Sequence, residues 1–415
     1  MIDLLQKHAK TGPSNKHGVL AAVETLHDCS DPHNTRIRET AKGSKSQCQI
    51  KDLFLMHYIR LLKPPRYSAR PRNRNGSVSA LITITSDLGD DFYFRDTVLT
   101  AEVLQESGDP RLVLASKEFH WKMGMRVLKI ELNVAPSKHN FYDSVILAIS
   151  SAAGGTPVAD DISHPRDGGL EIITAYSPPF RPIDGEEAEK FVQRRIMIDP
   201  SKTLRIWEET GESIARHIWD GGLALTAYLA QNASSEAFST DKLNALHKQL
   251  NPRKTLRALE LGSGCGVVGL SLAALYEKCH VTMTDLSSAE EILMKNIEDY
   301  NSNFQGEVEF RVLDWDQAIP ESLASRSWDI IVIADCTYNT ASAHSLVNVL
   351  KSLVGKSPDT VVVLAHKRRH DSEVLFFELM NAVFGMVDRV SFHNGNLETE
   401  ISVDIYTFKV MIKGS

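Results

Sequence analysis

The stretch LELGSGCGVVGL, residues 259–270, places four glycines within twelve positions. It follows the apolar run TLRALEL, which is typical of a buried strand, and leads into GVVGLSLAALYEKC, a helical pattern with apolar residues on nearly every side. Glycine costs backbone entropy, so a cluster of glycines indicates that something approaches the main chain closely. We interpret the segment as a ligand-binding turn between a strand and a helix.

From about residue 200 the sequence alternates between strand and helix patterns. The candidate strands after the turn are HVTMTD, VEFRVLD, WDIIVIAD and TVVVLAH, and helical patterns separate most of them. This alternation predicts a mainly parallel sheet covered by helices on both faces. The last two strands, MVDRVSFH and VDIYTFKVMIK, have no helix between them and are expected to form an antiparallel edge pair. We assign residues 200–415 to this α/β domain.

Two further parts precede the α/β domain. Residues 76–180 contain short alternating or β-branched runs separated by turn residues, which predicts a small antiparallel β-rich domain. The segment SPPFRPIDGEE, residues 177–187, has the prolines and the glycine of a linker. Residues 1–75 are polar and are expected to form an irregular, partly disordered leader.

Basic residues are concentrated at the end of this leader, although the whole chain has a net charge of −7. The basic stretch fits a nuclear-import or nucleic-acid patch, and it equally fits a solvated linker. Its members are Arg60, Lys63, Arg66, Arg70, Arg72 and Arg74. Because the net charge is negative, contact with nucleic acid is possible but not expected.

Composition restricts location and bound groups. The 415-residue chain shows no secretory leader and no apolar run of the roughly 20 residues that span a bilayer. Its five cysteines include no CxxC pair, which favours reduced thiols. His27, Cys29 and His33 lack a fourth ligand at matching spacing, so no metal is expected. We expect a monomer without membrane association, located in the cytoplasm, the nucleus or both.

The glycine spacing alone leaves the ligand open. Gly264, Gly266 and Gly269 also satisfy the dinucleotide pattern GxGxxG, and Asp285 lies where a ribose-binding acid belongs. Glu260 decides between the two ligands, because a carboxylate suits the amino group of S-adenosylmethionine and would repel a pyrophosphate. About fifty residues precede the turn within the α/β domain, and the fourth strand runs into the sequence DCTY, residues 335–338. These features favour S-adenosylmethionine.

From about Thr203 to its end, the sequence resembles the seven-stranded class I methyltransferases, and specifically methyltransferase family 16, which includes many protein-lysine methyltransferases. The resemblance is carried by IWDGGLALTAYL, LELGSGCGVVGL, TDLSS, LDW and IADCTY, the last with a DxxY signature. It implies a Rossmann-like seven-stranded fold with S-adenosylmethionine as cofactor.

The resemblance also implies roles for individual residues at the cofactor. Asp285 would bind the ribose hydroxyls, although an aspartate there could instead cap the following helix. Asp314 would accept from the adenine amine and Trp315 would pack on its ring, or the two are a turn aspartate and a core tryptophan. Trp219 would lie near the cation, or simply pack its helix. The full cofactor set is Trp219, Glu260, Gly262, Gly264, Gly266, Asp285, Asp314, Trp315 and Ala334.

Asp335 and Tyr338 are the predicted catalytic residues. Methyl transfer needs an aligned neutral nitrogen and creates little new charge, so positioning can supply much of the rate. We expect Asp335 to orient the acceptor amine and Tyr338 to wall its channel; an exposed aspartate is too weak to act as a strong base. The alternative for Asp335 is a helix cap. Cys-Thr between the two residues, in place of Pro-Pro, argues against nucleobase amines.

The leading hypothesis is an S-adenosylmethionine-dependent N-methyltransferase that acts on a lysine side chain of a protein. A small-molecule amine methyltransferase, a catalytically silent cofactor-binding module and an NAD oxidoreductase remain alternatives, and Glu260 argues against the last. The basic stretch HKRRH, residues 366–370, follows the fifth strand near the expected substrate opening. It is compatible with an acidic or nucleic-acid substrate, or with a solvated loop.

Overall fold

The structure, a computed structural model, describes residues 56–411 except for 70–75, 107–111, 135–143, 152–156, 158, 163–170, 183–185, 211–213, 234–242, 251–253, 356 and 394–401. All described residues fall in one compact unit. The predicted leader up to residue 55, with its candidate metal ligands, lies outside them. So do three members of the basic stretch, Arg70, Arg72 and Arg74.

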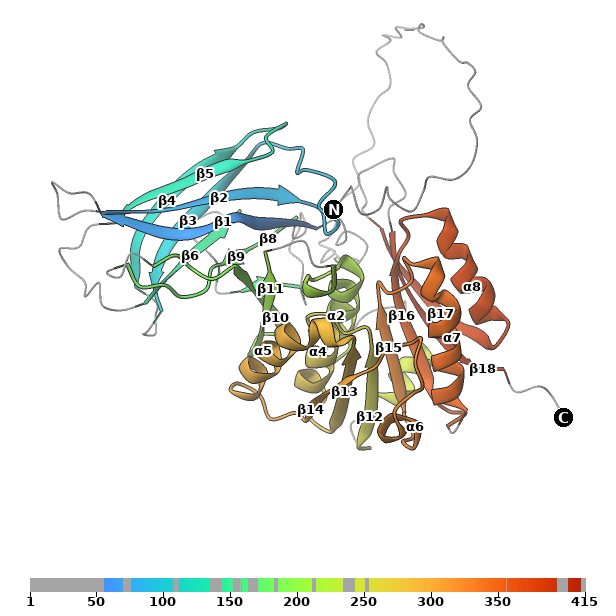
Figure 1. The fold of residues 1–415 in the computed structure, drawn as a ribbon. Helices are drawn as coiled ribbons and strands as arrows, with labels where there is room; N and C mark the ends of the chain where they lie inside the picture. The colour runs from blue at the N-terminus through green and yellow to red at the C-terminus, as the bar shows by residue number, and fades with distance from the viewer. Residues whose placement is uncertain are drawn as a thin grey trace, which may run out of the picture. The chain divides into compact units, whose positions relative to one another are not determined.

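Seven strands form the C-terminal sheet in the order β14-β13-β12-β15-β16-β18-β17 (Figure 1). Their bounds are β12 Leu256–Leu261, β13 Cys279–Asp285, β14 Val308–Val312, β15 Ile330–Ala334, β16 Val361–Lys367, β17 Phe384–His393 and β18 Ser402–Val410. The first five are parallel, and β18 pairs antiparallel with both β16 and β17. The Rossmann-like fold and the antiparallel closing pair are confirmed. Of that pair, β17 lies at an edge of the sheet and β18 lies inside it, between β16 and β17.

Helices cover both faces of this sheet because neighbouring strand residues point to opposite sides. Ala258 of β12 packs into one apolar core with helices α2, α4 and α5, and Leu259 packs into a second core with α7 and α8. None of the described helices is long and apolar enough to cross a membrane. The helix bounds are η4 Ile214–Arg216, α2 Asp220–Ala233, α3 Asn244–Gln249, α4 Val267–Leu275, η5 Ser287–Ala289, α5 Glu290–Asn301, α6 Glu321–Ala324, α7 Thr340–Val354, η6 Asp371–Glu373 and α8 Val374–Asn381.

The preceding strands form two sheets with a common core. One sheet has the order β5-β2-β1-β8, and the other has the order β11-β10-β9-β6-β3-β4, with β7 beside β10. Ile82 of β2 and Val103 of β3 are both fully buried in that core, so the sheets pack as a sandwich. The bounds are β1 His57–Ala69, β2 Gly76–Thr85, β3 Thr97–Gln105, β4 Val113–Trp121, β5 Leu128–Val134, β6 Val145–Ser150, β7 Asp160–Asp161, β8 Ile172–Ile173, β9 Ala175–Tyr176, β10 Phe191–Asp199 and β11 Lys202–Glu209.

The sandwich extends beyond the predicted limits at both ends. Strand β1 lies in the segment predicted to be irregular, and it pairs with β2 across a register shift between Lys63 and Arg66. Pro64 and Pro65 occupy that shift; prolines are tolerated at bulges, and they hide the strand pattern in the sequence. At the other end, β10 and β11 continue the sheet past residue 180. The predicted linker is held to the sheet by mutual backbone bonds between Phe180 and Val145.

The β10–β11 hairpin belongs equally to the α/β part of the chain. Ile196 and Ile206 are buried in the same apolar core as helices α2 and α4. Asn296 of α5 accepts a hydrogen bond from the backbone N of Trp207 at 2.7 Å and donates to its carbonyl at 3.1 Å. No solvated linker therefore separates the sandwich from the C-terminal sheet at this hairpin.

Candidate functional site

The glycine turn follows β12 at the carboxyl end of the parallel strands. The three glycines of the turn have positive φ values, which residues with a side chain rarely adopt. The values are +69° for Gly262, +53° for Gly264 and +79° for Gly266. A Cβ on Gly262 would lie 2.4 Å from Cys336 Sγ. Glycine at this position therefore makes room for the neighbouring DCTY loop, a packing requirement that spacing alone does not reveal.

A cavity of about 310 Å³ opens beside this turn. Every predicted site residue lines it except Gly266, which precedes α4 and whose added Cβ would meet Leu293. The cavity lies where ligands of open parallel sheets bind, outside the carboxyl ends of the strands. Predicted cofactor residues and both predicted catalytic residues therefore share one space.

Glu260 is buried at this cavity. Its Oε2 accepts a hydrogen bond from the backbone N of Gly269 at 3.1 Å. Burial raises the pKa of Glu260 to about 8, against the hydrogen bonds from Ser263 and Gly269 that lower it. A positive group beside this carboxyl would favour its ionised form. The carboxyl is therefore mostly protonated at pH 7 in the protein alone, and pairing with an ammonium group would require it to release that proton.

Asp285 ends β13 and faces the glycine turn. Its carboxylate accepts hydrogen bonds from the backbone N of Gly264 at 2.8 Å and of Leu286 at 2.7 Å. Helix η5 begins at Ser287 with Leu286 as its cap residue and without a side-chain cap bond. Asp285 therefore does not cap helix η5, and the helix-cap alternative is wrong. Instead, the carboxylate joins two strand ends and lines the cavity, where ribose hydroxyls could meet it.

The pair after β14 lies at the cavity wall. Asp314 Oδ1 accepts a hydrogen bond from the backbone N of Asp316 at 3.0 Å, which is a turn role. Trp315 is half-buried and packs against the apolar core under α7. Both residues also line the cavity, so their turn and core roles do not exclude the predicted contact with adenine.

Asp335 is the residue whose surroundings differ most from expectation. It is the only non-glycine residue with positive φ, +53°, among those that the structure describes. Its side chain is 1% exposed. Its Oδ2 accepts from the backbone N of Gly221 at 2.7 Å, and its Oδ1 accepts from the backbone N of Lys367 at 3.1 Å and from Arg369 Nη1 at 2.9 Å. These contacts hold the strained backbone in place.

The expectation of an exposed aspartate is thus wrong, because Asp335 is buried and ion-paired. The helix-cap alternative also fails, since Asn339 caps α7 by accepting from the backbone N of Ala341 at 3.0 Å. A carboxylate that already accepts from three donors is poorly placed to remove a proton. Strong general-base catalysis by Asp335 is therefore excluded because its carboxylate is already ion-paired and hydrogen-bonded, and not because the residue is exposed.

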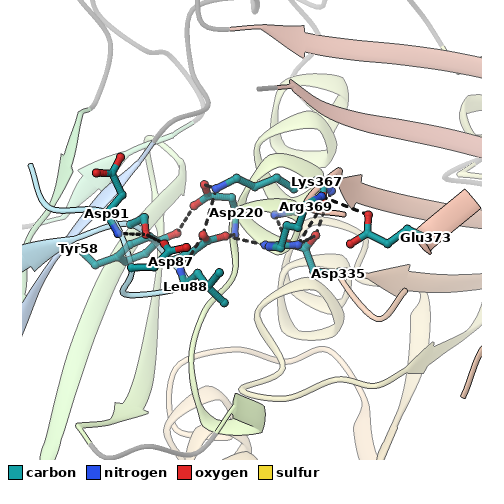
Figure 2. Close-up of polar contacts among 12 residues, drawn as sticks. Tyr58, Asp87, Leu88, Asp91, Asp220, Asp335, Lys367, Arg369 and Glu373 are labelled. Atoms are coloured by element: carbon teal, nitrogen blue, oxygen red, sulfur yellow. Dashed lines mark hydrogen bonds and ion pairs between the residues drawn. The ribbon is translucent and has the colours of Figure 1, made fainter. Parts of the chain in front are cut away.

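The basic stretch 366–370 begins within β16: His366 and Lys367 are buried and Arg369 is half-buried, whereas Arg368 and His370 are exposed. Figure 2 shows Lys367 and Arg369 beside Asp87, Asp220 and Asp335, which come from distant parts of the chain. Lys367 Nζ lies 3.0 Å from Asp87 Oδ1 and 2.7 Å from Asp220 Oδ2. Arg369 Nη2 lies 2.8 Å from Asp87 Oδ2, and its Nη1 pairs with Asp335. The solvated-loop interpretation is therefore wrong for these two cations.

Four residues of this ion-pair cluster were not singled out as site residues from the sequence. They are Asp87, Asp220, Lys367 and Arg369. Lys367 and Arg369 were visible only as part of a basic stretch, and Asp220 only within IWDGGLALTAYL. Asp87 carries no signal of its own, since it lies in the β2–β3 loop of the sandwich. Tyr58 of β1 also joins the group and donates to Asp220 Oδ1 at 2.7 Å.

Trp219, a predicted cofactor residue, and Tyr338, a predicted catalytic residue, also line the cavity. The guanidinium carbon of Arg369 lies 5.3 Å from the centroid of the Trp219 ring, within cation–π range. Tyr338 is 50% exposed while lining the cavity. Between Asp335 and Tyr338, Thr337 bonds His366 Nδ1 at 2.9 Å and so ties the DCTY loop to β16. No cluster able to hold a metal ion occurs within the described residues.

Comparison with known proteins places this site in a family context. The lysine methyltransferase family model matches residues 198–383. A UPF0665 family protein of Schizosaccharomyces pombe is 28% identical over 337 residues, covering 80% of this chain and 94% of that protein. Protein-lysine N-methyltransferase EFM6 of Saccharomyces cerevisiae is 29% identical over 46% of this chain and 78% of its own. Protein N-lysine methyltransferase METTL21A of Xenopus tropicalis is 27% identical over 49% and 81%.

Proposed function

We propose that this chain, which belongs to methyltransferase family 16 through residues 198–383, transfers a methyl group from S-adenosylmethionine to a lysine side chain of a protein substrate. The observation that carries the proposal is the shared cavity. Glu260 and Asp285 line it from the glycine turn, and Asp335 and Tyr338 line it from the DCTY loop. Donor and acceptor would therefore meet in one place.

The protein's own residues supply binding and alignment. The cofactor, when bound, provides a methyl group activated on a sulfonium. Glu260 would neutralise the ammonium of its amino acid part, Asp285 would hold its ribose, and Trp315 would cover its base. These residues place the reactive carbon, and holding reactants in line accounts for a large part of such rate enhancements.

On the acceptor side, the chain offers aromatic walls and a fixed loop. A lysine must lose its proton before attack, since its pKa is near 10.4 in water. Tyr338 would wall the channel of the amine, and Trp219 would shield the cofactor's cation next to it; burial next to positive charge favours the neutral amine. Asp335 would fix the DCTY loop by its bonds to Gly221 and Arg369, and thereby orient the acceptor.

The names of the relatives support a protein substrate. EFM6 and METTL21A are named as protein-lysine methyltransferases, and the chain matches most of their length. The acceptor loop Asp335-Cys-Thr-Tyr338 is compatible with an aliphatic amine. We further propose a monomer located in the cytoplasm, the nucleus or both. Chromatography with light scattering and a fluorescent fusion would test these two points.

Radiolabelling tests the proposed reaction. Purified full-length protein would be incubated with tritiated S-adenosylmethionine and a cell lysate, and labelled bands would be hydrolysed for amino acid analysis. We expect tritium in methyllysine. Label confined to small molecules would favour an amine methyltransferase of another substrate class. Binding of the cofactor without any label would favour a silent binding module.

A further inference from the structure

We propose that Asp87, in the β2–β3 loop of the sandwich, is a positioning residue for methyl transfer, because it fixes Arg369 and through it Asp335 and Trp219. This inference rests on the proposed function for its kinetic consequence. Its structural content, that the sandwich holds the acceptor loop in shape, stands on the contacts alone. It gives the N-terminal strands a role in the chemistry.

The first step is the hold of Asp87 on the α/β part of the chain. Its carboxylate lies 3.0 Å from Lys367 Nζ and 2.8 Å from Arg369 Nη2. It also accepts from the backbone N of Asp220 at 3.2 Å, at the start of α2. Within its own loop it accepts from the backbone N of Leu88 at 2.8 Å (Figure 2). One side chain thus joins the sandwich, α2 and the end of β16.

The second step is the hold of Arg369 on the site. Asp335 accepts from both arms of the guanidinium, from Nη1 at 2.9 Å and from Nη2 at 3.3 Å, and Asp87 accepts from Nη2 at 2.8 Å. The same guanidinium lies over the ring of Trp219, which lines the cavity. Removing the charge of Asp87 would leave the guanidinium held only by Asp335 and by the carbonyl of Lys367, and would loosen its position against Asp335 and Trp219.

Burial makes these contacts strong. The side chain of Asp87 is 1% exposed and that of Arg369 is 12% exposed. Burial alone would raise the pKa of Asp87, but the charges of Lys367 and Arg369 lower it to about 2. The aspartate is therefore ionised throughout the neutral range. Little water reaches these charges to screen them, so removing one partner is costly.

Two variants of the same loop separate positioning from general loss of charge. Asp87→Asn removes the buried carboxylate while keeping its shape. Asp91→Asn makes the same change at an exposed aspartate four residues later and serves as the matched control. For each, the number and affinity of cofactor sites would be measured by calorimetry with S-adenosylmethionine. The rate of tritium transfer into the labelled protein band would then be expressed per cofactor site.

We expect Asp87→Asn to lower the rate per site by up to about 100-fold, because small displacements of aligned groups have effects of that size. The affinity for S-adenosylmethionine should change less than about twofold, since Asp87 does not line the cavity and the cofactor's polar groups would meet Glu260 and Asp285 at the glycine turn. Asp91→Asn should match the wild type. In an Arg369→Gln background, Asp87→Asn should have little further effect, because the two residues act in series.

A purely structural role would give a different result. If Asp87→Asn lost activity only in proportion to lost cofactor sites, with an unchanged rate per site, the proposal would be overturned. Hydrogen exchange supplies a readout that needs no substrate. We expect the segment 333–340 to exchange at least about tenfold faster in Asp87→Asn while α4 stays protected. Unchanged exchange there would also overturn it, even if the wild type labelled no protein and the proposed function itself had failed.

Discussion

Arg369 Nη2 lies 2.8 Å from Asp87 Oδ2, although 282 positions separate the two residues in the sequence. The contact joins a loop of the N-terminal sandwich to the end of a strand in the C-terminal sheet. On its other side, Arg369 bonds Asp335 at the predicted acceptor position. The acceptor side of the site is therefore assembled from both parts of the chain.

Substitution of Asp335 tests whether this arrangement is needed for methyl transfer. We expect Asp335→Ala to abolish methyl transfer and to leave the affinity for S-adenosylmethionine nearly intact. Because the change removes one partner of a buried ion pair, unfolding should also become easier by about 3 kcal/mol. Calorimetric titration and denaturant melts would measure the two effects separately. Loss of cofactor binding in a protein that remains folded would contradict the acceptor-side role.

Gly221 should tolerate no side chain. A Cβ there would lie 2.7 Å from the carboxylate carbon of Asp335, which bonds the backbone N of this residue. Gly221→Ala should therefore displace Asp335 and sharply reduce methyl transfer. Gly385→Ala is a suitable control, because its Cβ would meet only Met411 at an ordinary 3.5 Å. Equal activities of the two variants would argue against a requirement for this close approach.

Cofactor affinity should depend on pH through Glu260. The carboxyl has a pKa of about 8 in the protein alone, so at pH 6 it must release a proton before it can pair with an ammonium. Affinity for S-adenosylmethionine should rise between pH 6 and about 8, and then fall again as the cofactor's α-amino group loses its own proton above about pH 8. Calorimetry in two buffers of different ionisation enthalpy would count the released proton. A pH-independent affinity would show that Glu260 does not meet the amino group.

The carboxyl of Glu260 should also make the free energy of unfolding fall as the pH rises. The pKa of Glu260 rises from 4.5 to about 8 on folding. Below pH 4.5 the group is protonated in both states; between pH 4.5 and 8 mainly the unfolded chain releases the proton, so the stability of the wild type falls across that window. Glu260→Gln cannot ionise. Its Tm without cofactor should exceed that of the wild type increasingly as pH rises towards 8, and thermal melts at pH 5 and pH 8 would check this.

Sequence patterns predicted a set of residues that the structure brings to one cavity, because these residues lie at or just after strand ends. Glu260, Asp285 and the DCTY loop all follow buried apolar runs, and parallel strands bring such ends together. The ion pairs could not be found in this way. Nothing in the surroundings of Asp87 indicates that it meets Lys367, since long-range pairing of charges leaves no local periodicity.

The limits of the sandwich were missed for equally local reasons. Pro64 and Pro65 interrupt the alternation of β1, and the strand continues past them through a register shift. Phe180 lies in a segment rich in proline, yet its backbone pairs with that of Val145. In each case proline interrupts the backbone hydrogen bonds between two strands only locally, and the neighbouring residues still pair in the sheet.

The hairpin of β10 and β11 bears on how this protein can be divided for expression. The match to the family model begins at residue 198, which is the second-last residue of β10. A fragment trimmed to that match would keep β11 and lose most of β10, the strand that pairs with it. Leu204 and Ile206 would remain on a single unpaired strand over the helices that they now help to cover. Such a fragment should aggregate, whereas one that starts before β1 should stay dispersed, and the enzyme is best handled without dissection.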